Sequence, residues 1–204
     1  ADGKSARFYV WESSIQEPGL AAKFPDIKTF LGQGIDDPYA TIRMDFGPNG
    51  FHAQVLTANG TYYIDPYARG EINNYISYFR TDLQKAGTWL CEVPDNPTSF
   101  RGPVTEAACL GTNLRTYRLA VACTGEYAQA PGIAAGSNPT TLHNAIVTTV
   151  NRVTGVYEVE VSVRMVLVAN NNLIEFLNAG TDPFTGNNNA NVLINESQTV
   201  IDAN

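Results

Sequence analysis

Three cysteines and two histidines are the side chains of this sequence most able to bind a metal or act as nucleophiles. An odd number of cysteines leaves at least one thiol outside any internal disulfide, and a thiolate is a strong zinc ligand. Cys91 stands in the string Trp-Leu-Cys-Glu-Val-Pro-Asp, residues 89–95. Two interpretations are open for it: a thiol that blocks a metal, or an ordinary buried or disulfide-bonded cysteine. Cys109 and Cys123 flank a predicted strand and are expected to be structural. They would pair with each other or with cysteines further along, or Cys123 would pack in the core.

The two histidines, His52 and His143, are expected to have no chemical role. Neither lies in a His-Glu-x-x-His sequence, in which two histidines one helical turn apart bind zinc and the glutamate activates a water molecule. His52 alternates with apolar neighbours in a predicted strand, and His143 follows a core-facing leucine on a predicted helix. We expect both side chains to face solvent. No zinc site of this type can be built from the chain.

Acidic side chains raise the question of a calcium site or an acid/base pair. Asp182 opens the turn Asp-Pro-Phe-Thr-Gly, which three asparagines follow, and oxygen-rich loops bind calcium. No complete calcium-binding loop is spelled out, however, and a polar turn needs no metal. Asp36, Asp37 and Asp65 stand in short strings that end in proline, so we expect turn residues there and not a catalytic carboxylate pair.

The elements that must position these side chains change character along the chain. The first hundred residues form short segments of alternating apolar and polar residues, which Gly, Asn and Pro interrupt, and this pattern is typical of a β-meander. Strands are expected at residues 7–11, 40–46, 51–56, 61–65 and 76–80, with a short helix at 20–24. Beyond Pro94 the sequence is rich in Pro, Thr, Gly and Ala, and we expect a linker at residues 101–114.

The second half predicts alternating strands and helices. Asn138 and Pro139 supply a helix cap and first turn, and apolar residues then recur at helical spacing up to about Tyr157. Expected are a strand at 116–123, a helix at 139–157, strands at 159–168 and 173–177, and a helix at 192–201. Strand, helix, strand, strand, helix is an α/β arrangement of layers, so the whole chain is predicted to have a mixed α+β or α/β fold.

Composition and charge exclude several classes of partner. The 204 residues carry a formal net charge of -7, which argues against nucleic acid as a partner because phosphates require a cationic surface. Acidity also argues against binding to an anionic membrane surface, and no segment has the roughly 20 apolar residues of a membrane span. Few lysines with many Asn, Thr and Gly residues are typical of secreted bacterial proteins.

Three strings of the second half resemble the opening of the catalytic domain in bacterial reprolysin-like metallopeptidases, which are adamalysin-type metzincins. They are Leu-Arg-Thr-Tyr-Arg-Leu-Ala-Val-Ala-Cys-Thr-Gly-Glu-Tyr at 114–127, Thr-Thr-Val-Asn-Arg-Val-Thr-Gly-Val-Tyr-Glu at 148–158 and Ala-Gly-Thr-Asp-Pro-Phe at 179–184. Upstream, Gly-Gln-Gly-Ile-Asp-Asp-Pro at 32–38 and Tyr-Ile-Asp-Pro-Tyr at 63–67 are similar to the C-terminal part of the prosegment of these enzymes.

The resemblance implies a secreted, zinc-dependent endopeptidase that is made as a zymogen. Residues 1–100 would be the C-terminal part of the prosegment, residues 101–114 the linker, and residues 115–204 the first elements of the metzincin upper subdomain. The zinc helix would follow residue 204. The chain alone is therefore expected to be inactive and to need the remainder of the catalytic domain as its partner, while peptides and proteins would be the substrates of the complete enzyme.

Two further roles follow from the resemblance. The string around Cys91 is similar to the cysteine switch of matrixin prosegments, in which a thiolate takes the fourth zinc position, although the preceding Pro-Arg is missing and Glu92 replaces a glycine. Arg101 and Arg115 are candidates for the maturation cut, and Arg101 is preferred because Arg115 begins a predicted strand. Two alternatives stay open: a stand-alone prosegment that inhibits the mature enzyme or helps it to fold, and a secreted binding module that is not an enzyme.

Overall fold

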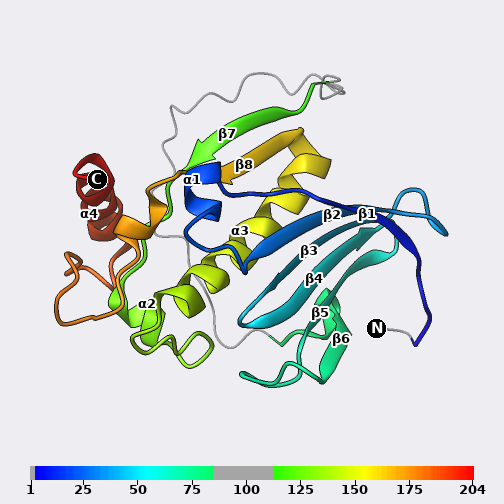
Figure 1. Ribbon diagram of the computed structural model, residues 1–204, viewed down its shortest axis with the longest axis horizontal. Helices are drawn as coiled ribbons and strands as arrows, with labels where there is room; N and C mark the ends of the chain where they lie inside the picture. Colours follow the sequence, from blue (N-terminus) through cyan, green and yellow to red (C-terminus); the bar gives the residue numbers. More distant parts are fainter. Residues whose placement is uncertain (1–2, 85–112) are drawn as a thin grey trace.

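A six-stranded antiparallel sheet occupies the first half of the chain and is the blue-to-green part of the ribbon in Figure 1. The computed structural model describes residues 3–84 and 113–204. The strands lie side by side in chain order: β1 Phe8–Glu12, β2 Lys28–Gly34, β3 Thr41–Gly47, β4 Gly50–Thr57, β5 Gly60–Pro66 and β6 Tyr75–Phe79. A short helix, α1 Pro18–Ala21, stands between β1 and β2, and a 3-10 turn, η1 Arg80–Asp82, follows β6. The meander order agrees with the sequence prediction, but β2 is a strand that the sequence patterns do not predict, because Gly32 and Gly34 weaken its strand pattern.

Two tight turns set the register of the central strands. Gly47 pairs with Gly50, and Thr57 pairs with Gly60, so only two residues connect the strands at each turn. Gly50 and Gly60 have φ values of +102° and +124°, which residues with a side chain rarely adopt. Glycine at these two positions is therefore what allows the chain to reverse so sharply.

The second half contains the longest helix and a parallel pair of strands. Its elements are β7 Arg115–Leu119, α2 Gly125–Gln129, α3 Pro139–Val161, β8 Val163–Leu167, the 3-10 turn η2 Asn171–Ile174 and α4 Ala190–Asp202. β7 and β8 pair in parallel, and α3 is the crossover between them. None of the described helices is long and apolar enough to cross a membrane.

The start of α3 agrees with the sequence prediction, whereas its end does not. The Asn138 side chain accepts hydrogen bonds from the N–H groups of Thr140 and Thr141, and Pro139 occupies the first turn, as the cap pattern predicts. The helix then continues to Val161, through residues predicted as strand, and β8 is correspondingly short. Ser162, in the left-handed conformation with φ 53°, ends the helix. In this last part of the helix the valines are exposed, and Glu158 forms ion pairs with Arg43 and Arg164.

Two predicted strands of the second half need correction. The strand expected at 173–177 is wrong, because η2 stands there and only Glu175 forms an isolated bridge, with Cys123. The strand expected at 116–123 ends at Leu119. The cause is Asn171, whose side chain bonds both the N–H and the C=O of Val121 and so replaces strand pairing there.

The helix α3 lies between two sheets, and this position widens its buried surface. It runs diagonally between the six-stranded sheet and the β7–β8 pair (Figure 1) and contacts β3, β4 and β8. Of the apolar positions predicted for its core face, those at Leu142, Ile146 and Val150 are buried, but Val153 and Val156 are exposed. The second buried face is polar; its members are Asn144, Thr148, Asn151 and Gly155.

The six-stranded sheet turns its polar face toward α3 and its apolar face away. Because side chains alternate along a strand, Arg43 and Asp45 of β3 face the helix, whereas Ile42 and Met44 face the opposite side. The apolar face gathers a cluster of its own, formed by Phe8, Ile42, Met44, Phe51, Ala53, Val55, Tyr62 and Ile64. The contact between the sheet and the helix is therefore mainly polar.

One hydrophobic core joins the two halves of the chain. From the first half, Ile15, Leu20, Phe24 and Ile27 are buried in it. They pack with apolar residues of α3, β8 and the segment around α2: Cys123, Ala128, Ala135, Leu142, Ile146, Val147, Val150 and Leu167. Burial of each large apolar side chain contributes about 1.5–3 kcal/mol, so the segment between β1 and β2 is a main source of adhesion between the halves.

Candidate functional site

Among the described residues, most of the buried polar side chains lie where the first half meets the second half. We call the contact of β3, β4 and β5 with α3 the polar interface. Its sheet side consists of Arg43, Asp45, His52, Gln54 and Asp65, and its helix side of Asn144, Thr148, Asn151, Arg152, Gly155 and Glu158. A second contact, made by residues 13–27, is called the anchor segment.

A buried ion pair lies at one end of the polar interface. The Arg43 guanidinium donates from Nε to Glu158 Oε2 at 3.1 Å, and its second terminal nitrogen pairs with Glu158 Oε1. The side chains of Arg43 and Glu158 are 2% and 11% exposed. Burial lowers the pKa of Arg43, and the Glu158 carboxylate acts against that shift. Arg164 also donates to Glu158 Oε1, at 2.5 Å, so one carboxylate serves two cations.

In the middle of the interface, a buried aspartate receives two hydrogen bonds. Asp45 is 1% exposed, and its Oδ2 accepts from the Thr148 hydroxyl at 2.6 Å and lies 3.1 Å from His52 Nδ1. His52 is half-buried against this carboxylate, so its expected solvent-facing position is wrong. The reason is that α3 covers the face of the sheet that alternation alone would assign to solvent.

At the other end of the interface, the Asp65 carboxylate of β5 accepts two hydrogen bonds. Its Oδ1 accepts from an Arg152 terminal nitrogen at 2.5 Å, and its Oδ2 accepts from the Tyr78 hydroxyl at 2.6 Å. The Arg152 guanidinium also lies 4.9 Å from the centre of the Tyr63 ring, a cation–π distance. Burial and the neighbouring Asp65 carboxylate raise the pKa of Tyr78 to about 12. Asp65 is therefore an ion-pair partner within a strand and not the turn residue that the sequence predicts.

Several buried polar atoms of the interface have no hydrogen-bond partner within the protein. They are Gln54 Oε1, Asn144 Nδ2, both amide atoms of Asn151, and Arg152 Nε. Groups of this kind are usually satisfied by buried water. A cavity of about 680 Å³ opens at the Arg152 end of the interface and is lined by His52, Asp65, Thr148 and Arg152, among others. The polar interface is thus accessible to solvent from one side, unlike the apolar core.

The anchor segment holds the first half on the β7–β8 pair. Leu167 N–H donates to Ile15 O at 2.7 Å and Glu17 N–H donates to Leu167 O at 2.9 Å, so Gln16 forms a parallel bridge with Leu167. Glu17 accepts from Arg118 Nε at 2.6 Å and from Ala169 N–H at 2.8 Å. These two hydrogen bonds lower the pKa of Glu17, the Arg118 bond being the larger cause.

His143 lies at the centre of the anchor contact and is fully buried. Its Nε2 is 2.8 Å from Gln16 Oε1, and its Nδ1 is 2.8 Å from Glu175 Oε1. The Phe24 ring stacks on the imidazole with centres 4.0 Å apart. The expected surface position of His143 is therefore wrong. Sequence periodicity places His143 at the edge of the apolar stripe, and only the first half of the chain, which covers that edge, makes it buried.

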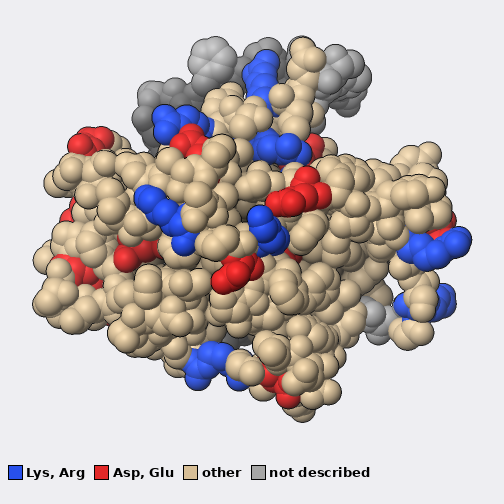
Figure 2. Space-filling view, viewed as in Figure 1, with Lys and Arg blue, Asp and Glu red and all other residues tan. Residues whose placement is uncertain are grey.

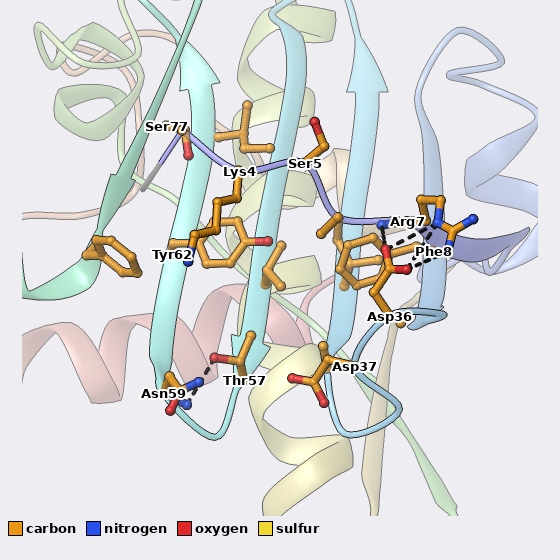
Figure 3. A pocket seen from close by; sticks show the side chains of 18 residues that line it. Lys4, Ser5, Arg7, Phe8, Asp36, Asp37, Thr57, Asn59, Tyr62 and Ser77 are labelled. Atoms are coloured by element: carbon orange, nitrogen blue, oxygen red, sulfur yellow. Dashed lines mark hydrogen bonds and ion pairs between the residues drawn. The ribbon is translucent and has the colours of Figure 1, made fainter.

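A second cavity, of about 790 Å³, lies on the apolar face of the six-stranded sheet. The segment that carries Lys4 and Ser5 crosses the strands there, and Tyr62 lies beneath it (Figure 3). Arg7 closes the cavity at one side through an exposed ion pair with Asp36 at 2.6 Å. Asp36 is therefore an ion-pair partner as well as a turn residue. On the face of the molecule in Figure 2, acidic and basic side chains are interspersed, and neither sign forms a continuous patch.

The remaining candidates from the sequence fall into two groups. Cys91, Arg101 and Cys109 lie outside the described residues, and so do residues 101–112 of the predicted linker. Arg115 is the first residue of β7, and its N–H donates to Ser162 O at 2.9 Å, so a cut there would remove the first pairing of the strand.

Cys123 carries a free thiol in the apolar core, where burial raises its pKa to about 12. Of the roles left open for this residue, the structure favours core packing. Asp182 uses both carboxylate oxygens for backbone N–H groups, those of Gly125 at 2.6 Å and Phe184 at 2.9 Å. These contacts account for the turn at Asp182 without a metal, so the calcium prediction gains no support from them.

A zinc site requires at least three protein ligands that converge on one point. Among residues 3–84 and 113–204, no three His, Cys, Asp or Glu side chains are grouped in this way. The sequence also contains no His-Glu-x-x-His string. The described residues do not fit a zinc site.

The second half of the chain is similar to a known family. Residues 113–204 contain a parallel strand pair, the long crossover helix α3 and the final helix α4. These residues match the family model of reprolysin-like metallo-peptidases of family M12B, and the match begins two residues before β7. It supports a reprolysin-like metallopeptidase, a family of zinc-dependent peptidases. Comparisons with curated proteins and with solved structures gave no match.

Proposed function

We propose that this chain is the front part of a secreted zinc-dependent endopeptidase precursor. Residues 1–100 are the C-terminal part of its prosegment, residues 101–114 the linker, and residues 115–204 the first part of the catalytic domain. The observation that carries the proposal is the extent of the family match, which starts at residue 113 and leaves the whole six-stranded sheet outside. The zinc helix lies beyond residue 204 in this proposal, so the chain alone does not hydrolyse peptides.

The character of the polar interface supports a six-stranded sheet that can separate from α3. Partners that must be stable apart usually meet through polar surfaces, because an exposed apolar face aggregates. α3 presents Asn144, Thr148 and Asn151 to the sheet, and such side chains remain well hydrated when the sheet leaves. A permanent core would place apolar residues at these positions.

The anchor contact supports a second role for the first half as a folding aid and inhibitor. Ile15, Leu20 and Phe24 complete the apolar core of the second half, and Gln16 supplies a hydrogen-bond partner for its buried His143. The second half therefore reaches its final packing with the help of the first. In this proposal Cys91 confers latency by binding the zinc, and Arg101 is the preferred maturation site over Arg115.

The test uses the precursor extended past residue 204. Zinc content and hydrolysis of a protein substrate are measured before and after maturation, and the N-terminus of the active form is determined. We expect about one zinc per molecule, activity only after maturation, and a new N-terminus within residues 101–115. A Cys91→Ser precursor should show activity earlier than the unaltered one. An active form that retains the six-stranded sheet would contradict the proposal.

A further inference from the structure

Residues 15–17 bind the edge of β8 as an extended peptide binds a sheet. The N–H and C=O of Leu167 both pair with the backbone of this segment, at 2.7 and 2.9 Å. The β7–β8 pair thereby gains a short third strand in parallel orientation. This arrangement is strand addition, in which main-chain hydrogen bonds supply affinity and side-chain pockets supply specificity. A sheet edge of this kind, once uncovered, tends to pair with another chain.

The side chain of Gln16 contacts a buried histidine of the second half, His143. Its carboxamide oxygen lies 2.8 Å from Nε2 of His143, while the other imidazole nitrogen faces the Glu175 carboxylate. Both ring nitrogens therefore face oxygen atoms, and Gln16 itself is 5% exposed. An apolar side chain at position 16 would leave the buried Nε2 without a partner, which is costly. The pocket thus selects a carboxamide, which can form a hydrogen bond with Nε2 in either tautomer of the imidazole.

The next residue adds a charge requirement. Glu17 lies against Arg118 of β7 and the N–H of Ala169, at 2.6 and 2.8 Å. Lys23 continues the contact on the other side of the same turn, with its ammonium 2.7 Å from Asn172 Oδ1. Phe24 then stacks on His143. The second half therefore contacts four features of this short segment in a fixed order: its backbone, the Gln16 carboxamide, the Glu17 carboxylate and the Phe24 ring.

We propose that the edge of β8, together with His143, Arg118 and the Ala169 N–H, is a peptide-recognition site of the metallopeptidase half. Its ligand is an extended peptide with a carboxamide side chain followed by a carboxylate, and residues 15–17 occupy it in this chain. The proposal rests on the proposed function in that it takes the first half to be removable. Once the first half leaves, a free peptide of the same sequence binds the vacated edge.

The test measures binding of a fluorescent peptide, residues 12–25, to the full chain by anisotropy. In the unaltered chain the tethered segment competes at an effective concentration in the millimolar range, so the free peptide is expected to bind weakly. The double variant Gln16→Ala, Glu17→Ala weakens the tethered copy and should bind the peptide at least about tenfold more tightly. Hydrogen exchange at Leu167 N–H reports whether the tethered copy has left the edge.

Two peptide variants distinguish sequence-specific binding from nonspecific binding. A peptide with Gln16→Leu should bind about tenfold more weakly or worse, because His143 Nε2 loses its partner. A peptide with Ala22→Ser, altered at an exposed position, should bind as the unaltered peptide does. If the double variant does not fold, the single variant Glu17→Ala takes its place, since Glu17 is only partly buried.

Two results would overturn the proposal. The first is a failure of the peptide to bind a folded variant in which Leu167 N–H exchanges freely. The second is equal binding of the unaltered and Gln16→Leu peptides. Neither readout depends on zinc or on hydrolysis, so a failure of this inference is distinguishable from a failure of the proposed peptidase function.

Discussion

Replacement of Glu158 by glutamine tests whether the buried ion pair holds the two halves together. The substitution preserves the shape of the side chain but removes the charge that Arg43 and Arg164 share. Arg43, with a side chain 2% exposed, then remains as a buried cation beside a second cation. Removing one partner of a buried pair typically costs about 3–5 kcal/mol, a large part of the roughly 5–15 kcal/mol that stabilise a domain.

Urea unfolding of the full chain, followed by tryptophan fluorescence, measures this effect. A loss of about 3 kcal/mol lowers the midpoint by more than about 1 M urea, because the slope for proteins of this size is roughly 1–3 kcal/mol per M. The matched control is Asp36→Asn, which alters an arginine–carboxylate pair whose side chains are 73% and 42% exposed. We expect no measurable shift for the control, since exposed pairs contribute little. A midpoint for Glu158→Gln no lower than that of the control would refute the reasoning.

Three further predictions follow from the described contacts. Gly155→Ala should lower the melting temperature of the full chain even though alanine favours a helix. The added Cβ would lie 2.8 Å from Arg43 Cγ, and crowding of this kind costs about 1–3 kcal/mol. A raised melting temperature would contradict this prediction. The stability that Glu17 contributes should be fully present above about pH 4.5, its ordinary pKa, and be lost as the pH falls through its lowered pKa in the folded chain. The stability difference between the unaltered chain and Glu17→Gln should therefore disappear in acid. A difference that grows in acid would exclude this linkage. Cys123, with its pKa raised to about 12, should resist alkylation by iodoacetamide at pH 8 until the chain unfolds, as peptide mapping can show, and rapid labelling of the folded chain would disprove its burial.

Local patterns in the sequence predict five of the six strands of the sheet and miss β2, where Gly32 and Gly34 weaken the strand pattern. From β3 to β5 each reversal carries its own turn residue, Gly50 or Gly60, and these strands pair in chain order, so no distant contact is needed to place them. The start of α3 is equally local, because Asn138 and Pro139 supply its cap and first turn. Its end is not local, since the valines near Val161 suit a strand as well as a helix.

The polar interface and the anchor contact could not be predicted from the sequence. Alternation shows that Arg43 and Asp45 share one face of β3, but polar residues on one face of a strand usually indicate solvent. Only the packed structure shows that α3 covers this face. Likewise, Gln16 and His143 are far apart in the chain, and no spacing rule joins them. The buried histidine was therefore misassigned.

The family resemblance followed from strings that cluster in the second half, and the family match covers residues 113–204. The candidate site residues predicted in the linker region, Cys91 and Arg101, lie outside the described residues and remain predictions. What the structure adds is the way in which the first half is attached: a polar interface that water can enter, and an anchor segment that pairs with the edge of β8.

The most direct test of the central claim is intact-mass spectrometry of the natural, denatured protein combined with zinc analysis. We expect a polypeptide that continues past residue 204 into a His-Glu-x-x-His helix, or a second chain that carries it, with about one zinc per molecule. A natural product that contains residues 1–204, carries no such helix on any chain and binds no zinc would contradict the assignment to a zinc endopeptidase precursor.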